Sequence, residues 1–191
     1  MTTPYTIVNL EQGTPEWLEW RSNGIGASDA PTIMGENPWK RPAQLLAEKI
    51  GTTKKSAGNA AMARGTALEP EARQRYETIT GNRVHPACLQ SNIHEWQRAS
   101  LDGLSPDGRT VVEIKCGDSV YRKTASNRQV PSYYFGQLQH ILAVTDLSCI
   151  DFFCWLPKLP EIHLNIKRDD QYIARLIAAE QTFWQQLLKK T

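Results

Sequence analysis

The spacing of hydrophobic and polar positions divides the chain into a helical first part and a strand-rich second part. In residues 1–80 the apolar positions recur at helical intervals, and proline and glycine mark where helices begin and end. Thr14 before Pro15 is typical of a helix start, because proline fits the first helical position. We expect helices from Pro15, from Ser28 to Met34, over residues 43–50, and over residues 60–80 with an interruption near Gly65.

From residue 83 onward, short runs rich in β-branched and apolar residues predict strands. Pro106-Asp107-Gly108 lies between the second and third runs and is typical of a tight hairpin turn. The expected elements are strands at 84–93, 97–101 and 110–116, a polar loop at 117–130, a helix at 131–144, strands at 148–156 and 161–166, and an amphipathic helix at 169–190.

The order of these elements predicts a single α+β domain over residues 1–191, with a central mixed β-sheet flanked by helices. Within it we expect a helical N-terminal part over residues 1–80, a hairpin and core over residues 83–167, and a C-terminal helix over residues 169–190. A length of 191 residues and a hydrophobic fraction of 40% suit one packed domain.

The charge balance narrows the classes of function. Lys and Arg number 22 against 20 Asp and Glu, which gives a formal net charge of +2. This excludes a polybasic protein that holds polyanions by bulk charge, but it leaves nucleic acid open as the substrate of a local site. No apolar stretch approaches the roughly 18–20 residues of a membrane span, and no signal-peptide pattern opens the chain, so we expect a cytoplasmic protein that does not bind membranes.

The four cysteines lack the spacing of zinc-ribbon or zinc-finger sites. We expect buried, reduced thiols, and the alternative is an iron–sulfur cluster on all four. They are Cys88, Cys116, Cys149 and Cys154.

The residues that carry chemistry flank the predicted hairpin turn. On a strand Glu113 and Lys115 point the same way while Ile114 points into the core, and the turn brings Asp102 beside Glu113. Two adjacent carboxylates repel unless a cation lies between them, and their hard oxygens suit Mg²⁺ or Mn²⁺, with the Ile114 carbonyl as a further ligand. Lys115 would orient or deprotonate an attacking water, or stabilise charge developing on phosphate. The pattern therefore indicates metal-assisted phosphodiester hydrolysis.

A structural interpretation competes with this one. Glu-x-Lys on a strand is often an exposed ion pair, and Asp-Gly is often only a turn. The hairpin turn between Asp102 and Glu113 favours the functional interpretation, because it supplies a reason for the two carboxylates to meet.

A resemblance to a known family begins at the spacing Asp102-x10-Glu113-Ile114-Lys115, which is similar to the PD-(D/E)xK nuclease motif with Leu101 where proline often stands. With three further blocks in order, the chain resembles the lambda-exonuclease-like (YqaJ viral recombinase) family over about residues 11–157. The further blocks are Glu16-Trp17-Leu18-x-x-Arg21 with Gly24-Ile25-Gly26-Ala27-Ser28-Asp29, then Arg64-Gly65-Thr66-x-x-Glu69-x-x-Ala72, then Tyr134-Phe135-Gly136-Gln137-Leu138-Gln139.

The resemblance implies a restriction-endonuclease-like core that uses Mg²⁺, with Mn²⁺ as a substitute and two ions per site. It assigns the metal to Asp102, Glu113 and the carbonyl of Ile114, water activation to Lys115, and supporting roles to Glu69 and Gln137. Without the resemblance, Glu69 would form a capping box with Thr66, and Gln137 would be a polar residue of a helix surface. Gln139 lies about 200° round the helix from Gln137, so both cannot face one site.

The resemblance also implies that Arg21, Ser28 and Ser100 hold the 5′-terminal phosphate of DNA. A guanidinium and hydroxyls match a phosphate, and a helix N-terminus at Ser28 would add N–H groups. The alternatives are a plain helix cap for Ser28 and a surface ion pair for Arg21. Other DNA-contact candidates are Trp39, Lys40 and Arg41, and the predicted loop with Arg122, Lys123 and Arg128.

The expected activity is that of a 5′→3′ exonuclease that degrades one strand of linear double-stranded DNA to mononucleotides and leaves a 3′ single strand. The resemblance implies phage or prophage recombination in a bacterial host, beside a single-strand annealing protein, and a ring-shaped homotrimer. The alternatives are a structure-specific or restriction-type endonuclease, and a non-catalytic DNA-binding recombination accessory protein.

Overall fold

A computed structural model describes residues 3–53 and 60–190 of the chain. In these residues the strands are β1 (Tyr5–Val8), β2 (Ile25–Gly26), β3 (His85–Ser91), β4 (Gln97–Leu104), β5 (Val111–Lys115), β6 (Cys149–Cys154) and β7 (Ile162–Lys167). The helices are α1 (Pro15–Ser22), the 3₁₀ turn η1 (Ala27–Asp29), α2 (Ala30–Ile33), α3 (Pro42–Lys49), α4 (Ala60–Thr80), α5 (Asp118–Asn127), α6 (Ser132–Thr145) and α7 (Asp170–Leu188).

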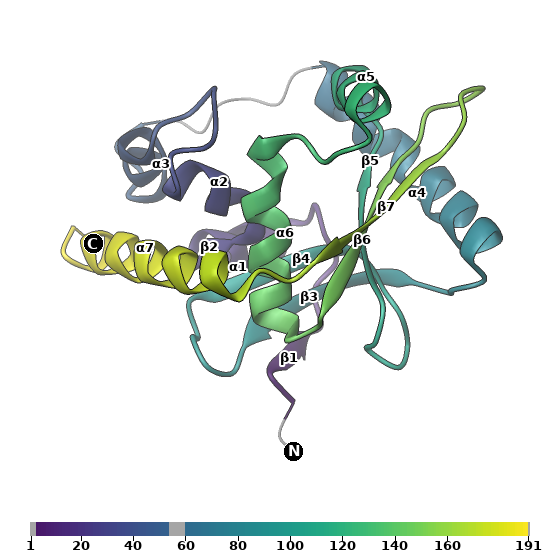
Figure 1. Ribbon diagram of the computed structural model, residues 1–191. Helices are drawn as coiled ribbons and strands as arrows, with labels where there is room; N and C mark the ends of the chain where they lie inside the picture. The colour runs from purple at the N-terminus through teal and green to yellow at the C-terminus, as the bar shows by residue number, and fades with distance from the viewer. Residues whose placement is uncertain (1–2, 54–59, 191) are drawn as a thin grey trace.

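The strands form one mixed sheet. Its order is β1-β3-β4-β5-β6-β7, with the short β2 paired in parallel to β4. The central pair β5–β6 is parallel, while the other neighbours along this path run antiparallel. Helices cover both sides, with α6 on one side of the strands and α4 on the other (Figure 1). The predicted α+β class with a mixed sheet flanked by helices is confirmed.

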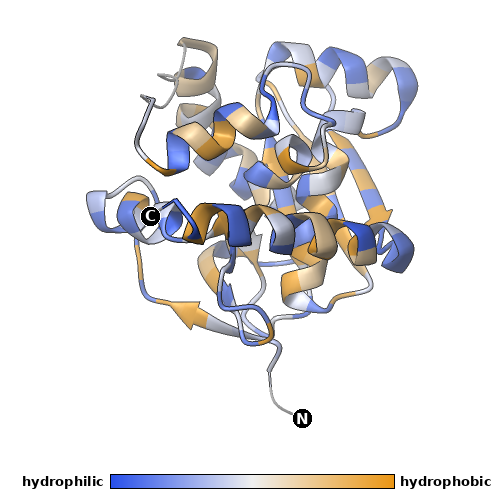
Figure 2. Ribbon diagram, turned by 90° about the vertical axis from the view of Figure 1, so that its left-hand side faces the viewer, coloured by the Kyte–Doolittle hydropathy of each residue, from blue (hydrophilic) through white to orange (hydrophobic). Residues whose placement is uncertain are grey.

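The core has a layer on each side of the sheet. On one side, α6 packs Leu138 and Ile141 against sheet residues such as Phe152. On the other, α4 packs Ala72 and Tyr76 against residues of β5 and β6. The helices carry hydrophobic and hydrophilic residues side by side along their length, as expected when one face packs and the other meets solvent (Figure 2). Among the described residues no helix combines the length and apolar composition needed to cross a membrane.

A buried polar network ties α6 and α7 to the sheet. His140 on α6 places Nδ1 2.6 Å from Glu180 Oε1 on α7, and Nε2 3.1 Å from the carbonyl of Arg98 on β4. Gln97 donates to the other Glu180 oxygen at 2.7 Å. Because both ring nitrogens face acceptors, the ring satisfies them only as an imidazolium. Burial opposes this charge, but Glu180 outweighs burial and raises the pKa of His140.

Three local predictions differ from the structure. The predicted polar loop at 117–130 is largely helix α5. Its buried residues Val120, Tyr121 and Thr124 are too few to give a recognisable helical repeat of apolar positions in the sequence. The helix over residues 60–80 is not interrupted near Gly65, since α4 runs through this glycine from Ala60 to Thr80. Strand β1 was not predicted, since its residues are exposed or half-buried and carry no apolar alternation.

Candidate active site

The centre of the site is the fork where β4 and β5 separate. Their pairing covers Gly103 with Val112 and Leu104 with Val111. Beyond it, the Ile114 N–H donates to Asp102 Oδ2 at 2.7 Å, so a side chain takes the place of the partner strand. Asp102 is thereby fixed beside β5 without closing the ladder, and the fork leaves room next to both strands.

Glu113 lies in the middle of the sheet with only 2% of its surface exposed. Its Oε1 accepts hydrogen bonds from Lys115 Nζ and Gln137 Nε2, each at 2.5 Å. Its Oε2 is buried and has no hydrogen-bond partner among the described residues. An ionised oxygen in this position is unfavourable unless something outside the protein chain binds it.

The half-buried carboxyl of Asp102 and the buried carboxylate of Glu113 shift the pKa values of the site. Burial and the neighbouring charge of Glu113 raise the pKa of Asp102 well above its usual range. Burial would lower the pKa of Lys115, but the carboxylates of Glu113 and Asp102 outweigh it and raise that pKa. Lys115 is therefore a firmly charged ammonium, and its Nζ also lies 4.9 Å from the ring centre of Tyr134.

Helix α4 brings a third carboxylate to the same region. Glu69 Oε1 forms an ion pair with Arg73 Nη2 at 2.7 Å, and Arg73 Nε donates to the carbonyl of Asp102 at 2.7 Å. Burial raises the pKa of Glu69, and Glu113 adds to the rise while Arg73 opposes it. The capping-box alternative for Glu69 is wrong, because Thr66 lies inside α4 and bonds to the carbonyl one turn earlier.

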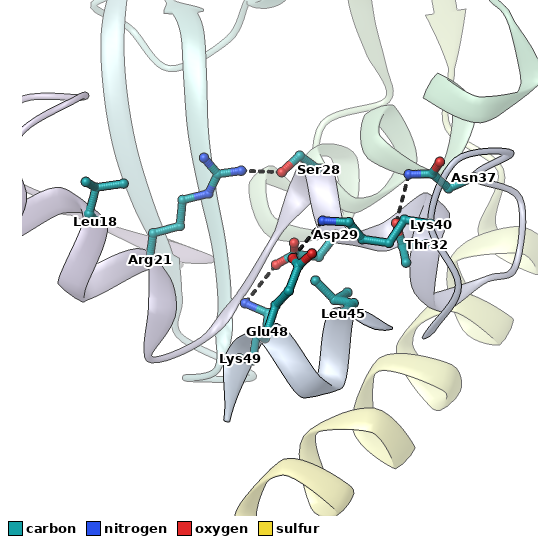
Figure 3. A pocket seen from close by; sticks show the side chains of 10 residues that line it. All are labelled: Leu18, Arg21, Ser28, Asp29, Thr32, Asn37, Lys40, Leu45, Glu48 and Lys49. Atoms are coloured by element: carbon teal, nitrogen blue, oxygen red, sulfur yellow. Dashed lines mark hydrogen bonds and ion pairs between the residues drawn. The ribbon is translucent and has the colours of Figure 1, made fainter. Parts of the chain in front are cut away.

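The structure brings the predicted phosphate-binding residues together next to this fork. The Arg21 guanidinium points at the Ser28 hydroxyl, as Figure 3 shows. Ser100 Oγ accepts from Trp17 Nε1 at 2.9 Å, and the Trp17 ring lies 5.0 Å from the Arg21 guanidinium. A cavity of about 320 Å³ connects the predicted phosphate-binding residues with the fork. Its lining includes Arg21, Ser28, Ser100, Asp102, Glu113, Lys115 and Gln137.

Two details of this region differ from the expectations. Ser28 does not cap a helix, because it lies inside η1, where Asp29 Oδ2 accepts from the Gly26 N–H at 3.0 Å. Asp29 forms its ion pair with Lys49, at 2.9 Å, and not with Arg21, although the charge of Arg21 helps to lower the pKa of Asp29. Both differences leave the Ser28 hydroxyl and the Arg21 guanidinium directed at each other and at the cavity.

The donor set fits a divalent cation. A group of three or more His, Cys, Asp and Glu side chains able to hold a metal does not occur in residues 3–53 and 60–190. A cation here would therefore use Asp102, the unpartnered oxygen of Glu113 and the Ile114 carbonyl, with water or substrate oxygens completing its shell, a set that suits Mg²⁺ or Mn²⁺. The same finding makes the iron–sulfur alternative wrong, and the four cysteines are free thiols.

The other DNA-contact candidates lie farther out. Trp39 is 69% exposed and makes an edge contact with Tyr133, whose ring also carries Lys123 Nζ at 4.9 Å. A cavity of about 570 Å³ joins Trp39 and Tyr133 to Glu69 and Lys115. Lys40, in contrast, pairs with a glutamate of α3 at 2.7 Å.

The sequence interpretation missed Arg73, Tyr134 and Arg98. Arg73 stands four residues after Glu69, a helical ion-pair spacing that was available as a signal. Tyr134 forms part of the motif that was assigned only for its glutamine, and Arg98 carried no signal because its importance depends on which side chains surround it.

Comparison with known proteins identifies the family of the chain. A model of the YqaJ-like viral recombinase domain matches residues 16–148, which include the whole fork and Gln137. The chain belongs to the YqaJ-like viral recombinase domain family. Among curated members of similar sequence are the uncharacterized protein YqaJ of Bacillus subtilis, 29% identical over 181 residues, and protein D345L of African swine fever virus, 28% identical over 180 residues. These alignments cover 92% and 73% of the chain but 57% and 49% of the relatives, so the chain spans about half their length.

Solved structures with a similar fold include alkaline exonuclease LHK-Exo of Laribacter hongkongensis. It is 30% identical, with a TM-score of 0.81 over 93% of this YqaJ-like chain and 94% of that one. The same enzyme in complex with dAMP gives a TM-score of 0.82. A phage-related exonuclease of Haemophilus somnus, 15% identical with a TM-score of 0.63 over 87% of this chain and 96% of that one, supports the fold alone. The predicted restriction-endonuclease-like core is confirmed.

Proposed function

We propose that this chain is a metal-dependent 5′→3′ exonuclease that degrades one strand of linear double-stranded DNA to mononucleotides and leaves a 3′ single strand. The observation that carries the proposal is the buried, unpartnered oxygen of Glu113 beside Asp102 and Lys115. Such an arrangement destabilises the protein unless a cation and its substrate compensate it.

Each side chain of the fork has a place in the proposed chemistry. Asp102, Glu113 and the Ile114 carbonyl would hold the metal, which supplies Lewis-acid activation of a phosphodiester. Lys115 faces the same cavity as a charged ammonium, placed to orient the attacking water and to stabilise negative charge on the phosphate. Gln137 fixes the orientation of Glu113 through the bond to Oε1, and Glu69 positions Arg73 against Asp102.

The adjoining pocket supports the proposed attack at chain ends. Arg21, Ser28 and Ser100 line the cavity that also contains the fork, so a phosphate held there lies next to the bond to be cut. A terminal phosphate carries more charge than an internal one and is not connected to further chain, which suits a pocket lined by the Arg21 guanidinium and the hydroxyls of Ser28 and Ser100. Selection of 5′-phosphorylated ends follows from this arrangement.

The test compares three substrates with Mg²⁺: a 5′-phosphorylated linear duplex, its 5′-hydroxyl form, and a covalently closed circle. We expect release of mononucleotides from the first, slower release from the second, and none from the circle. Excess EDTA should stop the reaction, and Mg²⁺ or Mn²⁺ should restore it. Digestion of the circle would favour the endonuclease alternative, and no digestion of any substrate would favour a non-catalytic DNA-binding accessory protein.

A variant pair isolates the contribution of Lys115. Lys115→Ala should lower the rate by at least about 100-fold, on the scale of losing an electrostatic group from a preorganised site. Lys167→Ala removes the same charge from an exposed position of β7 and should leave the rate unchanged. Full activity of Lys115→Ala would refute the proposed chemistry.

The biological setting is part of the proposal. The family and the alkaline exonuclease of similar structure support a nuclease role in phage-type recombination, beside a single-strand annealing protein in a bacterial host. A ring-shaped homotrimer would enclose the duplex during degradation. Light scattering coupled to gel filtration tests this state, and a monomer at working concentration would contradict it.

A further inference from the structure

Arg98 on β4 is a half-buried arginine without a counter-charge. Its Nε and Nη1 are buried and have no hydrogen-bond partner, and no carboxylate within the described part of the chain forms an ion pair with it. Burial lowers the pKa of Arg98, with no acidic neighbour acting against the shift. A half-buried guanidinium without an ion pair is costly, and the cavity that Arg98 lines gives an anion bound there access to this residue.

Neighbouring residues hold the Arg98 side chain in place. The guanidinium lies 5.1 Å from the centre of the Trp20 ring on α1. Gly24 also lies against the side chain, because an added Cβ there would come within 2.5 Å of Arg98 Nε and 2.8 Å of the Trp96 carbonyl. The absence of a side chain at Gly24 therefore leaves the space that the arginine occupies.

The position of Arg98 along β4 relates it to the fork. Arg98, Ser100 and Asp102 alternate with the buried residues Gln97, Ala99 and Leu101 and share one face of the strand. Residues two apart on a strand are separated by about 6.8 Å, so Ser100 lies between the metal-binding carboxylate and the arginine. All three line the cavity that also contains Arg21.

The α1 tryptophans give the two arginines matching surroundings. Trp17 stacks on Arg21 and Trp20 stacks on Arg98, at 5.0 and 5.1 Å. One cavity thus receives two guanidinium groups, and neither is neutralised by an ion pair in the described residues. The two positive charges of the guanidiniums exceed the single negative charge of an internal phosphodiester. They match the nearly double negative charge of a terminal phosphate monoester.

We propose that Arg98 is a further phosphate-binding residue, which reaches the terminal 5′-phosphate from the side opposite the metal-binding carboxylates. This inference rests on the proposed function and adds a residue that closes the pocket at its far end. Arg98 would thereby contribute to the choice of phosphorylated chain ends over internal positions.

The test uses Arg98→Met, which keeps an apolar stem against the Trp20 ring and removes the charge. On the 5′-phosphorylated duplex kcat/KM should fall by about 10- to 100-fold, the scale of a hydrogen bond to a charged group. On the 5′-hydroxyl duplex it should stay within about twofold of wild type. Arg109→Met, which removes an exposed arginine at the β4–β5 turn, is the matched control and should change neither rate.

An equal loss on both substrates would overturn the proposal, since a packing role of Arg98 does not distinguish the two ends. Arg98→Lys provides a second variant if the methionine protein does not fold. It keeps the charge without the guanidinium fork and should lower the preference for phosphate by a smaller factor than the methionine. If Arg98→Met does not fold, a preference of Arg98→Lys for the 5′-phosphorylated duplex equal to that of wild type would likewise overturn the proposed role of the Arg98 guanidinium.

A binding measurement separates this proposal from the proposed activity. Calorimetry with dAMP and with deoxyadenosine should show about tenfold weaker binding of dAMP by Arg98→Met, and no change for the nucleoside. If wild type degrades both duplex ends equally, the end selection in the proposed function fails, and the dAMP result alone decides the role of Arg98. Unchanged dAMP affinity in the variant would refute it.

Discussion

Two buried carboxylates of the sheet have opposite surroundings, and exchanging each for an amide should have opposite effects. Glu113 has one oxygen without a hydrogen-bond partner in the part of the chain that the structure describes. Asp151 on β6 accepts from Tyr76 Oη at 2.6 Å and Asn165 Nδ2 at 2.9 Å, and its Oδ1 lies 3.0 Å from His163 Nε2. Burial would raise the pKa of Asp151, but these hydrogen bonds outweigh it and lower that pKa.

The expected free energies follow from those contacts. Glu113→Gln weakens the bond to Lys115, a charged hydrogen bond worth about 1.5–3 kcal/mol, and it replaces the unpartnered buried charge by an unpartnered amide, which relieves part of a cost of about 1–3 kcal/mol or more. It also removes the repulsion that raises the pKa of Asp102. These effects oppose one another, so we expect the free energy of unfolding to change by no more than about 1 kcal/mol. Asp151→Asn removes satisfied charged bonds with no such relief and should cost about 2–4 kcal/mol.

The assay is urea unfolding in EDTA, followed by nuclease activity on the 5′-phosphorylated duplex with Mg²⁺. Glu113→Gln should keep its stability and lose at least about 100-fold in rate, while Asp151→Asn should lose about 2–4 kcal/mol of unfolding free energy and keep most of its rate under conditions where it is folded. If Glu113→Gln is destabilised as strongly as Asp151→Asn, or if it remains active, the reasoning about the unpartnered oxygen is refuted.

Three further outcomes are expected. Arg73→Ala should weaken activation by Mg²⁺ about 10- to 100-fold through loss of the bond to the Asp102 carbonyl, and an unchanged Mg²⁺ titration would contradict this. The raised pKa of His140 means that its pair with Glu180 contributes fully below about pH 6.5 and is lost as pH rises through the folded-state value. The Tm difference between wild type and His140→Gln should therefore shrink from pH 6 to pH 9, and a constant difference would argue against the charged pair. Gly103→Ala should cost about 1–3 kcal/mol in urea unfolding, because a Cβ there would come within 2.7 Å of two valine side chains; wild-type stability would show that the sheet yields.

Much of the fold was readable in the sequence because it rests on local chemistry. Thr14 caps α1 before Pro15, and the turn at residues 105–110 closes β4 onto β5 as predicted. Helical geometry allows only one of Gln137 and Gln139 to face the site, and the family resemblance favours Gln137; the structure places Gln137 on Glu113 while Gln139 bonds to the carbonyl of Lys167.

What could not be predicted depends on contacts between distant segments. The buried face of α5 exists only because β6 and β7 lie beneath it. Ser28 looks like a helix cap in isolation, and its hydroxyl turns to Arg21 only once α1 is packed alongside. The surroundings of Arg98 could not be predicted, because Trp20 and Gly24 pack around it from other segments of the chain.

The turn between β4 and β5 determines to which face of the sheet the side chains of the site point. Successive side chains of a strand point to opposite faces, so a slip of one residue in this hairpin would rotate Glu113 to the face where Ile114 now packs against α4. A protein with one residue inserted near Gly108 would keep every letter of its motif, and its two carboxylates would no longer meet. The number of residues between Asp102 and Glu113, ten, thus determines whether the two carboxylates lie on the same face. A change in the turn can therefore abolish activity although the turn touches neither metal nor DNA.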